Sequence, residues 1–423
     1  MKYLFIFCLL ALSFINLSLF AASQDTLTWD YCLIEARKNN SELIAAQENV
    51  RQARAGRVIT ISNTLPEVSS QVSGSTSRST TGVTSDSYGY SLTARQLVFD
   101  GLKTPYDIAS AARNLKAAEY DYQVVSSNIR LSLRGGFVEL LRAQELVDIT
   151  KDIAGRREKN LEMVRLRYEA GREHKGSLLT AEANLAQALF EVAQAQRNIS
   201  LAQRRLINEL GRSTFTPLKV VSDFEIKDIA DPKKPDFEQL AQDTPFLRQL
   251  IARKEAAGFD LKSARADFFP KIYASGSVGN TDSSWPPQND QWSATISLSF
   301  PLFEGGSRIG ALSRARSLFN QAELNQRSGR DTVILTLEEA WKELQDGLDT
   351  VSVQEKFLAA AQERAKIAQA QYSNGLISFD DWTIIEDDLV RVKKSFLNAQ
   401  ANALVAEANW IQARGGTLDY VQK

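Results

Sequence analysis

Few side chains in this chain could do chemistry, and two adjacent acids are the most suggestive. His174 is the only histidine, so neither a His-based catalytic triad nor a multi-His metal site can form within one chain. Asp380 and Asp381 open a helical pattern, and around a symmetry axis they would form a negative ring that attracts cations. Ser378 followed by Asp381 also resembles a capping box, in which the acids only stabilise a helix start.

The composition argues against several functional classes. Lys plus Arg number 50 and Asp plus Glu number 51, so the formal net charge is -1 and no basic excess favours nucleic acid as a partner. The sequence contains no Walker-type or Rossmann glycine loop. Most carboxylates share helical segments with lysine and arginine, which is typical of solvated helix faces. We therefore expect no enzyme activity, no cofactor and no metal site.

The N-terminal segment 1–23 is predicted to be a signal peptide. Lys2 is followed by an apolar stretch, and small residues at 21–23 fit a cleavage site. A retained anchor helix is the alternative. Cys32 would be the lone cysteine of the mature chain, so no intramolecular disulfide is expected. No later run of 18 apolar residues occurs, so any further membrane crossing would have to use strands.

The chain contains an internal duplication with a constant offset of 204 residues. The predicted division is a first repeat at 24–211, a linker at 212–235 rich in proline, a second repeat at 236–415 and a C-terminal tail at 416–423. Six pairs of identical residues keep this offset in the same order: Pro66 and Pro270, Phe99 and Phe303, Gly101 and Gly305, Tyr168 and Tyr372, Gly171 and Gly375, and Gly211 and Gly415.

Each repeat follows the same predicted plan. A helix of about 30 residues leads to a strand hairpin (66–100 or 270–304), a helix of nearly 70 residues and a return helix of about 35. A helix of that length spans roughly 100 Å, too long for a compact domain. The return helices carry coiled-coil heptads, and small residues seven apart would allow close helix approach: Ala181, Ala188, Ala195 and Ala202.

The predicted strands alternate between apolar and polar residues. Tyr90 and Leu92 in the first repeat, and Ile296 and Leu298 in the second, would face one side, with Thr295 on the opposite side. Such alternation fits a membrane barrel wall, although a half-buried strand of a soluble sheet would look similar. Four strands per chain cannot close a membrane barrel, and exposed edges are not tolerated in lipid. Two chains would give about eight strands, and three would give about twelve, enough for a hollow lumen.

The chain resembles the TolC-type outer-membrane efflux protein family over essentially its whole mature length. The matching stretches are 96–101 and 300–306 after the strands, and 167–171 and 371–375 before the helix reversals. The resemblance implies a mainly α-helical trimer, with a twelve-strand β-barrel in the outer membrane joined to an α-helical barrel in the periplasm. It also implies three kinds of partner: outer-membrane lipid, a periplasmic adaptor and an inner-membrane transporter.

The resemblance further implies two sites. The helix reversals would form the periplasmic tip that docks the adaptor, with a pore constriction at Asp380 and Asp381. Asp381 is the matching lumen-lining acid, whereas Ile377 replaces a residue that is often basic, and Glu173 with Arg172 could substitute. Alternatively, the glycines are simple helix C-caps. The docking residues would be Tyr168, Gly171, Arg172, Ser177, Tyr372, Gly375, Leu376 and Ser378.

The expected function is that of an outer-membrane channel subunit in a tripartite efflux or type I secretion system. A passive porin would consist mainly of strands rather than of very long helices. A trimeric autotransporter adhesin would place its strands together at the C-terminus. A periplasmic coiled-coil scaffold is the remaining alternative, and it would partition with soluble fractions.

Overall fold

The computed structural model describes residues 25–222, 224 and 234–419. The predicted signal peptide lies outside the described residues, as do parts of the predicted linker (223 and 225–233) and of the C-terminal tail (420–423). The described chain is mainly helical with few strands, which confirms the expected class. The predicted division into two repeats stays a prediction, but the elements themselves repeat along the chain.

The helix bounds recur at the offset of 204 residues. Both long helices contain 67 residues, close to the expected length. None of the described helices is long and apolar enough to cross a membrane. The equivalent pairs are α2 (Ser41–Ser62) with α6 (Pro245–Ala266), α3 (Lys103–Glu169) with α7 (Ser307–Ser373), and α4 (Lys175–Leu210) with α8 (Phe379–Ala413).

The first helix of each repeat is divided, so the prediction of one 30-residue helix is wrong. In the second repeat, Pro245 begins α6 and Thr244 before it is extended, because proline disfavours helical conformation in the preceding residue. In the first repeat, Asn40 is extended, and its side-chain amide donates to a backbone oxygen at the end of α4 at 3.0 Å. The additional helices are α1 (Trp29–Asn39) and α5 (Phe237–Asp243).

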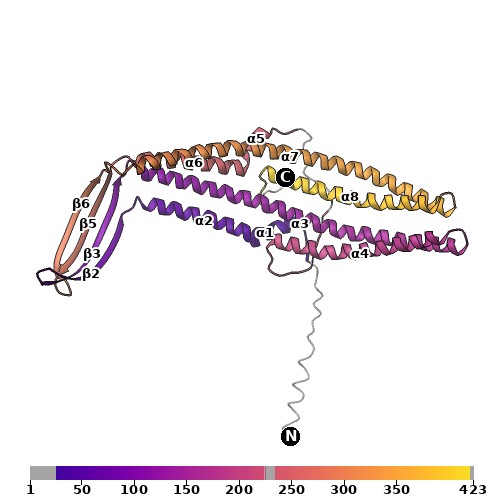
Figure 1. Ribbon diagram of the computed structural model, residues 1–423, viewed down its shortest axis with the longest axis horizontal. Coiled ribbons are helices and arrows are strands. Elements are labelled where there is room, and N and C mark those ends of the chain that lie inside the picture. The colour runs from indigo at the N-terminus through magenta and orange to yellow at the C-terminus, as the bar shows by residue number, and fades with distance from the viewer. Residues whose placement is uncertain (1–24, 223, 225–233, 420–423) are drawn as a thin grey trace, which may run out of the picture. The chain divides into compact units, whose positions relative to one another are not determined.

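Four long strands form one antiparallel sheet, and in Figure 1 they lie side by side. The central pair joins the second strand of the first repeat to the first strand of the second repeat. The outer strands are therefore the first and last along the chain, and each has an unpaired edge among the described residues. In order across the sheet, the strands are β2 (Glu67–Arg78), β3 (Thr84–Phe99), β5 (Lys271–Asp282) and β6 (Asn289–Ser299).

The register gathers apolar side chains on one face of the sheet. Leu92 lies opposite Val278, which lies opposite Trp292 on β6. Residues directly opposite each other point to the same face. On the other face, the hydroxyls of Ser277 and Ser293 are 2.8 Å apart. The expected apolar set, Tyr90, Leu92, Ile296 and Leu298, therefore shares one face, as the alternation predicted.

A small parallel strand pair was not expected from the sequence. β1 (Asp25–Leu27) pairs with β4 (Leu218–Val220), residues far apart in the chain. The Gln144 side chain fixes β4, because its amide donates to the Val220 oxygen at 2.9 Å and its oxygen accepts from the Val220 nitrogen at 3.0 Å. The start of the described chain is thereby held to the segment that follows the first repeat.

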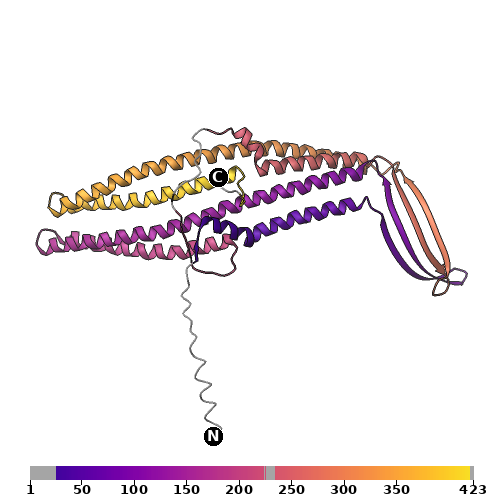
Figure 2. The same cartoon turned by 180° about the vertical axis from the view of Figure 1, so that it is seen from behind.

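The chain divides into two compact units, and α3, α7 and α8 contribute residues to both. The first unit contains residues up to 40, 132–227 and 345–408; the second contains 41–131, 228–344 and 409 onward. Within the first unit, Figures 1 and 2 show α4 running beside α3 and α8 beside α7. The predicted small-residue seam of α4 is buried there: Ala181, Ala188, Ala195 and Ala202.

Candidate functional site at the two helical tips

The reversal between α3 and α4 forms the first tip. Gly171 has a left-handed φ of 69°, which glycine adopts without steric cost. Its N–H donates to the Tyr168 oxygen at 3.0 Å, and the Arg172 N–H donates to the Arg167 oxygen at 2.8 Å. This pair of bonds is the Schellman pattern that ends helices. His174 then caps α4, because its Nδ1 accepts the Ser177 N–H at 3.2 Å.

The reversal between α7 and α8 forms the second tip with the same helix ending. Gly375 has φ 77°, and the N–H groups of Gly375 and Leu376 each donate back into the last turn of α7 at 2.9 Å. The start of α8 differs from that of α4. The Asp381 N–H donates to the Ser378 hydroxyl at 3.1 Å, and that hydroxyl donates to the Asp381 carboxylate at 2.7 Å. Asp381 therefore takes part in a capping pair, one of the two roles expected for it.

Three side chains join the two tips directly. Arg167, at the end of α3, donates at 2.8 Å to the Tyr372 backbone oxygen at the end of α7, which also accepts the Gly375 N–H. Its guanidinium carbon also lies 4.6 Å from the centre of the Tyr372 ring, close enough for a cation–π interaction. In the opposite direction, the Tyr372 hydroxyl donates to Glu173 at 2.8 Å. The two repeats are thus linked reciprocally at their tips.

The contact between Tyr372 and Glu173 changes the pKa values of both side chains. Burial, together with the nearby Glu173 carboxylate, raises the pKa of the Tyr372 hydroxyl above its ordinary value. Burial by itself would raise the pKa of Glu173. The hydrogen bonds from Tyr372, Ser177 and the His174 backbone outweigh that effect, so the pKa of Glu173 lies below its usual 4.5. At neutral pH, the link therefore consists of an ionised carboxylate and a protonated phenol.

An apolar cluster lies beneath the linked tips. Tyr372 stacks on Trp382 with ring centres 4.4 Å apart and planes 13° apart, and Phe379 meets both rings edge-on. All four helices contribute, so the cluster fixes how the two hairpins meet. Its buried members are Leu161, Val164, Ala181, Ala368, Tyr372, Phe379 and Trp382.

Farther from the tips, charged pairs join α8 to the helices of the first repeat. Glu386 is almost fully buried, and it accepts from Arg156 at 2.8 Å and from Asn160 at 3.4 Å. Lys394 pairs with Glu191 at 2.6 Å. Because a buried charge without a partner is costly, these pairs favour one alignment of α8. Two further pairs complete the row: Arg157 with Asp387, and Lys393 with Asp152.

The comparisons with known proteins bear on the whole chain. The family model described as "Outer membrane efflux protein" matches twice, at residues 33–212 and 237–416. These segments are again 204 residues apart and together cover most of the chain. The chain belongs to the outer membrane efflux protein family. It is accordingly an outer-membrane channel protein with a long helical periplasmic extension, which agrees with the function and location expected from the sequence.

Individual outer membrane efflux proteins match over most of their length. BepC, an outer membrane efflux protein of Brucella suis biovar 1, is 23% identical over 407 residues, covering 93% of this chain and 86% of BepC. SrpC, a solvent efflux pump outer membrane protein of Pseudomonas putida, is 25% identical and covers 90% and 83%. The open-state structure of the Neisseria gonorrhoeae MtrE channel superposes with a TM-score of 0.83, at 20% identity, covering 92% of this chain and 89% of MtrE. That last similarity concerns the fold alone.

The tip residues expected in this outer membrane efflux protein differ in accessibility. Leu376 is 72% exposed and Tyr168 is 38% exposed, while Arg172 and Ser378 are also exposed. Ser177 and Tyr372 are buried, so they shape the tips from within rather than offering a contact surface. Asp380 and Asp381 are both exposed on α8.

Several residues at the tips were not singled out from the sequence. The buried Glu386 was among them, and so was Arg167 as a bond donor, although Arg167 lies in one of the motifs that carried the resemblance. Arg167 contacts a residue 205 positions away, a distance over which local pattern carries no signal. The only hint for Glu386 in the sequence was its position four residues after Trp382, which places both residues on the same face of the helix. Among the described residues, no group of three or more His, Cys, Asp or Glu is placed to hold a metal ion.

Proposed function

We propose that three copies of this chain assemble into one exit duct, with a shared twelve-strand barrel in the outer membrane and a helical barrel in the periplasm. The observation that carries the proposal is the four-stranded sheet with unpaired edges at β2 and β6. Unpaired backbone groups cannot remain exposed to lipid, and four strands are too few to close on themselves. Three copies supply twelve strands, enough for an open lumen.

The two faces of the sheet support the same assembly. The face carrying Leu92, Val278 and Trp292 suits lipid, and the face carrying Thr93, Ser277 and Ser293 suits water. A closed barrel with the apolar face outward satisfies both. A soluble scaffold would instead expose this apolar face to water, which is costly over so many residues.

The internal strand pairing predicts the register between neighbouring copies. Within the chain, Thr93 on β3 lies opposite Ser277 on β5. Thr93 in the first repeat is equivalent to Ser297 in the second, and Ser277 in the second repeat is equivalent to Ser73 in the first. The equivalent pair is therefore Ser297 on β6 opposite Ser73 on β2 of a neighbouring copy. Ser297 lies within β6 and Ser73 lies within β2, so the shifted pair falls inside both strands.

Cysteine cross-linking tests this assembly. The native thiol gives little background, because burial and the nearby Glu35 carboxylate raise the pKa of Cys32 to about 12. Ser73→Cys combined with Ser297→Cys should yield covalent trimers on a non-reducing gel after mild oxidation in membranes. Thr93→Cys with Ser277→Cys is the matched control and should link within one chain. Ser73→Cys with Ser293→Cys is out of register and should stay monomeric.

Two cross-linking results would contradict the trimer. If the internal control links and the Ser73 and Ser297 pair does not, the copies do not pair through β6 and β2 in this register. Covalent species that stop at dimers would show a two-copy assembly instead.

The proposed duct would take its cargo from an inner-membrane transporter through a periplasmic adaptor that docks on the tips. The relative SrpC is described as part of a solvent efflux pump, which supports a transporter partner for this chain as well. The exposed Leu376 and Tyr168, together with Arg172, form the accessible docking surface. An adaptor would contact two chemically different tips on every copy, because Asp380 and Asp381 accompany only the second.

A further inference from the structure

We propose that the first tip is the pH-sensitive part of the adaptor-docking surface, and that His174 is the group through which protons act on it. The inference rests on the proposed function, because it assigns a regulation to the docking surface at the tips. His174 is the only histidine of the chain, and histidine is the side chain whose charge ordinarily changes between pH 5 and 8. It is exposed at the start of α4, where protons from the surrounding water reach it.

The imidazole of His174 is the helix cap of α4. Its Nδ1 accepts the Ser177 N–H at 3.2 Å, which satisfies one of the donors that the first turn of a helix leaves without a partner. The ring lies close over Gly176, where a Cβ would stand 3.0 Å from Nδ1. Only a ring nitrogen without a proton can accept a hydrogen bond, so this cap exists only while the imidazole is neutral.

The equivalent cap of the second tip keeps its chemistry over the same pH range. Ser378 stands at the position of His174 in the second repeat, and its hydroxyl accepts the Asp381 N–H at 3.1 Å. A hydroxyl does not gain a charge between pH 5 and 8, so it remains an acceptor throughout. The two tips therefore end and restart their helices in the same way, but protons can remove the cap of the first tip only.

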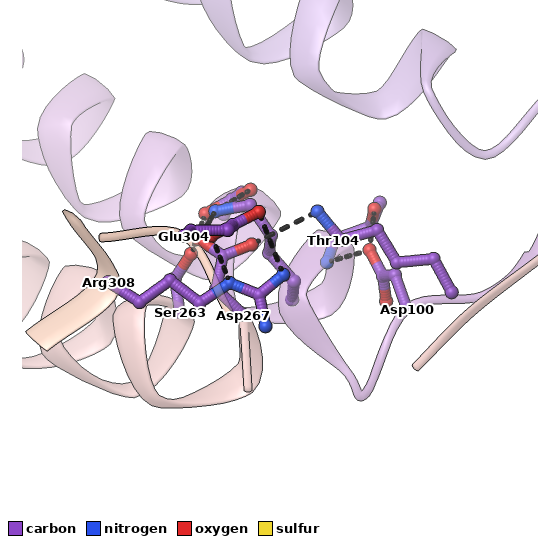
Figure 3. Close-up of polar contacts among 9 residues, drawn as sticks. Asp100, Thr104, Ser263, Asp267, Glu304 and Arg308 are labelled. Carbon is purple, nitrogen blue, oxygen red and sulfur yellow. Dashed lines mark hydrogen bonds and ion pairs between the residues drawn. The ribbon is translucent and has the colours of Figure 1, made fainter. Parts of the chain in front are cut away.

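The starts of α3 and α7 also rely on groups whose charge is ordinarily constant in this range. Figure 3 shows the buried Asp100, which accepts the Thr104 N–H at 2.8 Å in the first turn of α3. It also shows Glu304 and Arg308, which form an ion pair at 2.8 Å at the start of α7. Model carboxylates are ionised above about pH 5, and arginine stays charged. Of α3, α4, α7 and α8, only α4 starts on an imidazole.

The charged neighbours of His174 within the turn are Arg172, Glu173 and Lys175. Glu173 already accepts from the His174 backbone N–H at 3.3 Å and from the Ser177 hydroxyl at 2.9 Å. That hydroxyl also lies 3.2 Å from the ring Nε2. A protonated ring has only donors to offer, so it is attracted to the Glu173 carboxylate and leaves the Ser177 N–H without an acceptor.

Two groups from neighbouring helices act on the same carboxylate. The Tyr372 hydroxyl of α7 donates to Glu173 at 2.8 Å. Arg167 of α3 lies farther away, with its guanidinium carbon 4.6 Å from the centre of the Tyr372 ring, and it donates to the Tyr372 backbone oxygen. Because the bond from Arg167 to the backbone does not involve the imidazole, the two tips stay joined when the cap is lost. The effect of a proton on His174 is therefore local to the first turn of α4.

Hydrogen–deuterium exchange of the full-length protein in detergent tests the cap directly. Protection is measured as the exchange rate relative to that of an unstructured chain at the same pH, in peptides covering 172–180 and 376–384. In the wild type, the first peptide should lose about fivefold in protection between pH 8 and pH 5, as expected for the loss of an N-cap, and the second peptide should not change. His174→Ser gives the first tip the cap of the second and should remove the pH dependence. His174→Ala should lower protection at both pH values.

Photochemical cross-linking in cells tests the effect on docking. The photoreactive residue p-benzoylphenylalanine replaces Tyr168 in the first tip or, in a separate protein, Leu376 in the second; both side chains are exposed. Cells are kept at pH 8 or pH 5.5 before irradiation. The yield of cross-linked adduct from position 168 should fall at pH 5.5 in the chain that carries His174 and stay constant in His174→Ser. The yield from position 376 should be the same at both pH values.

The two measurements separate this inference from the proposed function. Equal exchange in the wild type and His174→Ser at pH 5 would overturn the pH-sensitive cap. Adducts from position 168 with the same pH dependence in both proteins would overturn the regulation of docking. If neither position gives an adduct at either pH, docking at the tips is itself wrong and the regulation of docking falls with it, while the exchange data still decide whether His174 is a pH-sensitive cap.

Discussion

Asp381 has two roles to distinguish, because it is exposed and also engaged in the Ser378 capping pair. Asp381→Asn keeps an acceptor for the Ser378 hydroxyl and removes only the charge. Ser378→Ala removes the cap and keeps the charge. If three copies of Asp381 line the pore, Asp381→Asn should lower cation preference and weaken block by multivalent cations in single-channel recordings, whereas Ser378→Ala should leave both unchanged.

The same pair of variants can exclude the pore role. Loss of the cap should cost about 1 kcal/mol of stability, visible as a lower melting temperature of the solubilised protein. If Asp381→Asn changes the melting temperature alone and ion selectivity stays as in the wild type, the acid is only a helix cap.

Glu173 gives the link between the tips a defined pH dependence. Its pKa in the folded protein lies below the ordinary 4.5, because Tyr372, Ser177 and the His174 backbone donate to the ionised carboxylate. This contribution to stability is therefore complete above pH 4.5 and is lost as the pH falls through the lowered pKa. Relative to the wild type, Glu173→Gln should be less stable by about 0.5–1 kcal/mol at pH 7.

The difference between the two proteins should vanish in acid. Thermal melts at pH 7 and below pH 4 measure this difference in stability. The contributions of the other carboxylates cancel in the comparison, because both proteins carry them. Tyr168→Phe is a suitable control, since this equivalent tyrosine in the first repeat is exposed. A stability gap that persists unchanged in acid would mean that the Glu173 charge contributes nothing to the link.

At the scale of elements, the two faces of β6 predict opposite responses to charge. Ile296 lies on the apolar face with Trp292, and Thr295 lies on the hydroxyl-bearing face. Ile296→Arg near the middle of the bilayer should cost roughly 2–4 kcal/mol, because an arginine on the lipid face loses its hydration. Thr295→Arg should be tolerated. Urea unfolding from lipid vesicles would measure both, and equal costs would mean that the faces do not divide into lipid and water.

Local pattern was sufficient for some elements and insufficient for others. Gly171 and Gly375 mark the ends of α3 and α7 because a left-handed residue is needed there, and that signal is carried by the residue itself. The interruption at Asn40 depends on a backbone oxygen of α4, and β1 depends on β4 nearly 200 residues away. Such partners are fixed by tertiary contact, so the sequence predicted long helices and hairpins but missed the break at Asn40 and the small parallel pair. The break before α6 was also missed, although Pro245 is a local signal for it.

Within the candidate site too, some features follow from short stretches of sequence and others depend on contacts between the repeats. The turns, the cap at Ser378 and the position of Asp381 follow from short stretches of sequence. The bond from Arg167 to Tyr372 and the burial of Glu386 require both repeats to be in place. Repeat equivalence did not help, because Ser177 and Asp381 occupy matching positions with different chemistry.

For the whole molecule, the tips should be required for transport and not for assembly. Leu376 is the most exposed apolar side chain of the second tip, and Leu376→Asp should abolish cargo export while trimer yield in detergent stays unchanged. Native mass spectrometry and a cell-based export assay report the two quantities separately. Gly375→Trp is a less specific change, because a positive φ makes any side chain there strain the turn itself. Normal export by Leu376→Asp would place docking elsewhere.

The order of strands in the sheet also has a consequence during biosynthesis. β2 and β3 can pair once the first repeat has been made, but the other edge of β3 stays unpaired until β5 has been synthesised. At 5–20 residues per second, the chain from Phe99 to Asp282 takes on the order of ten to forty seconds to synthesise. An isolated hairpin is marginal in water, and its open edge is a template for aggregation. Until β5 is available, the open edge of β3 is therefore a site at which unfinished chains can aggregate.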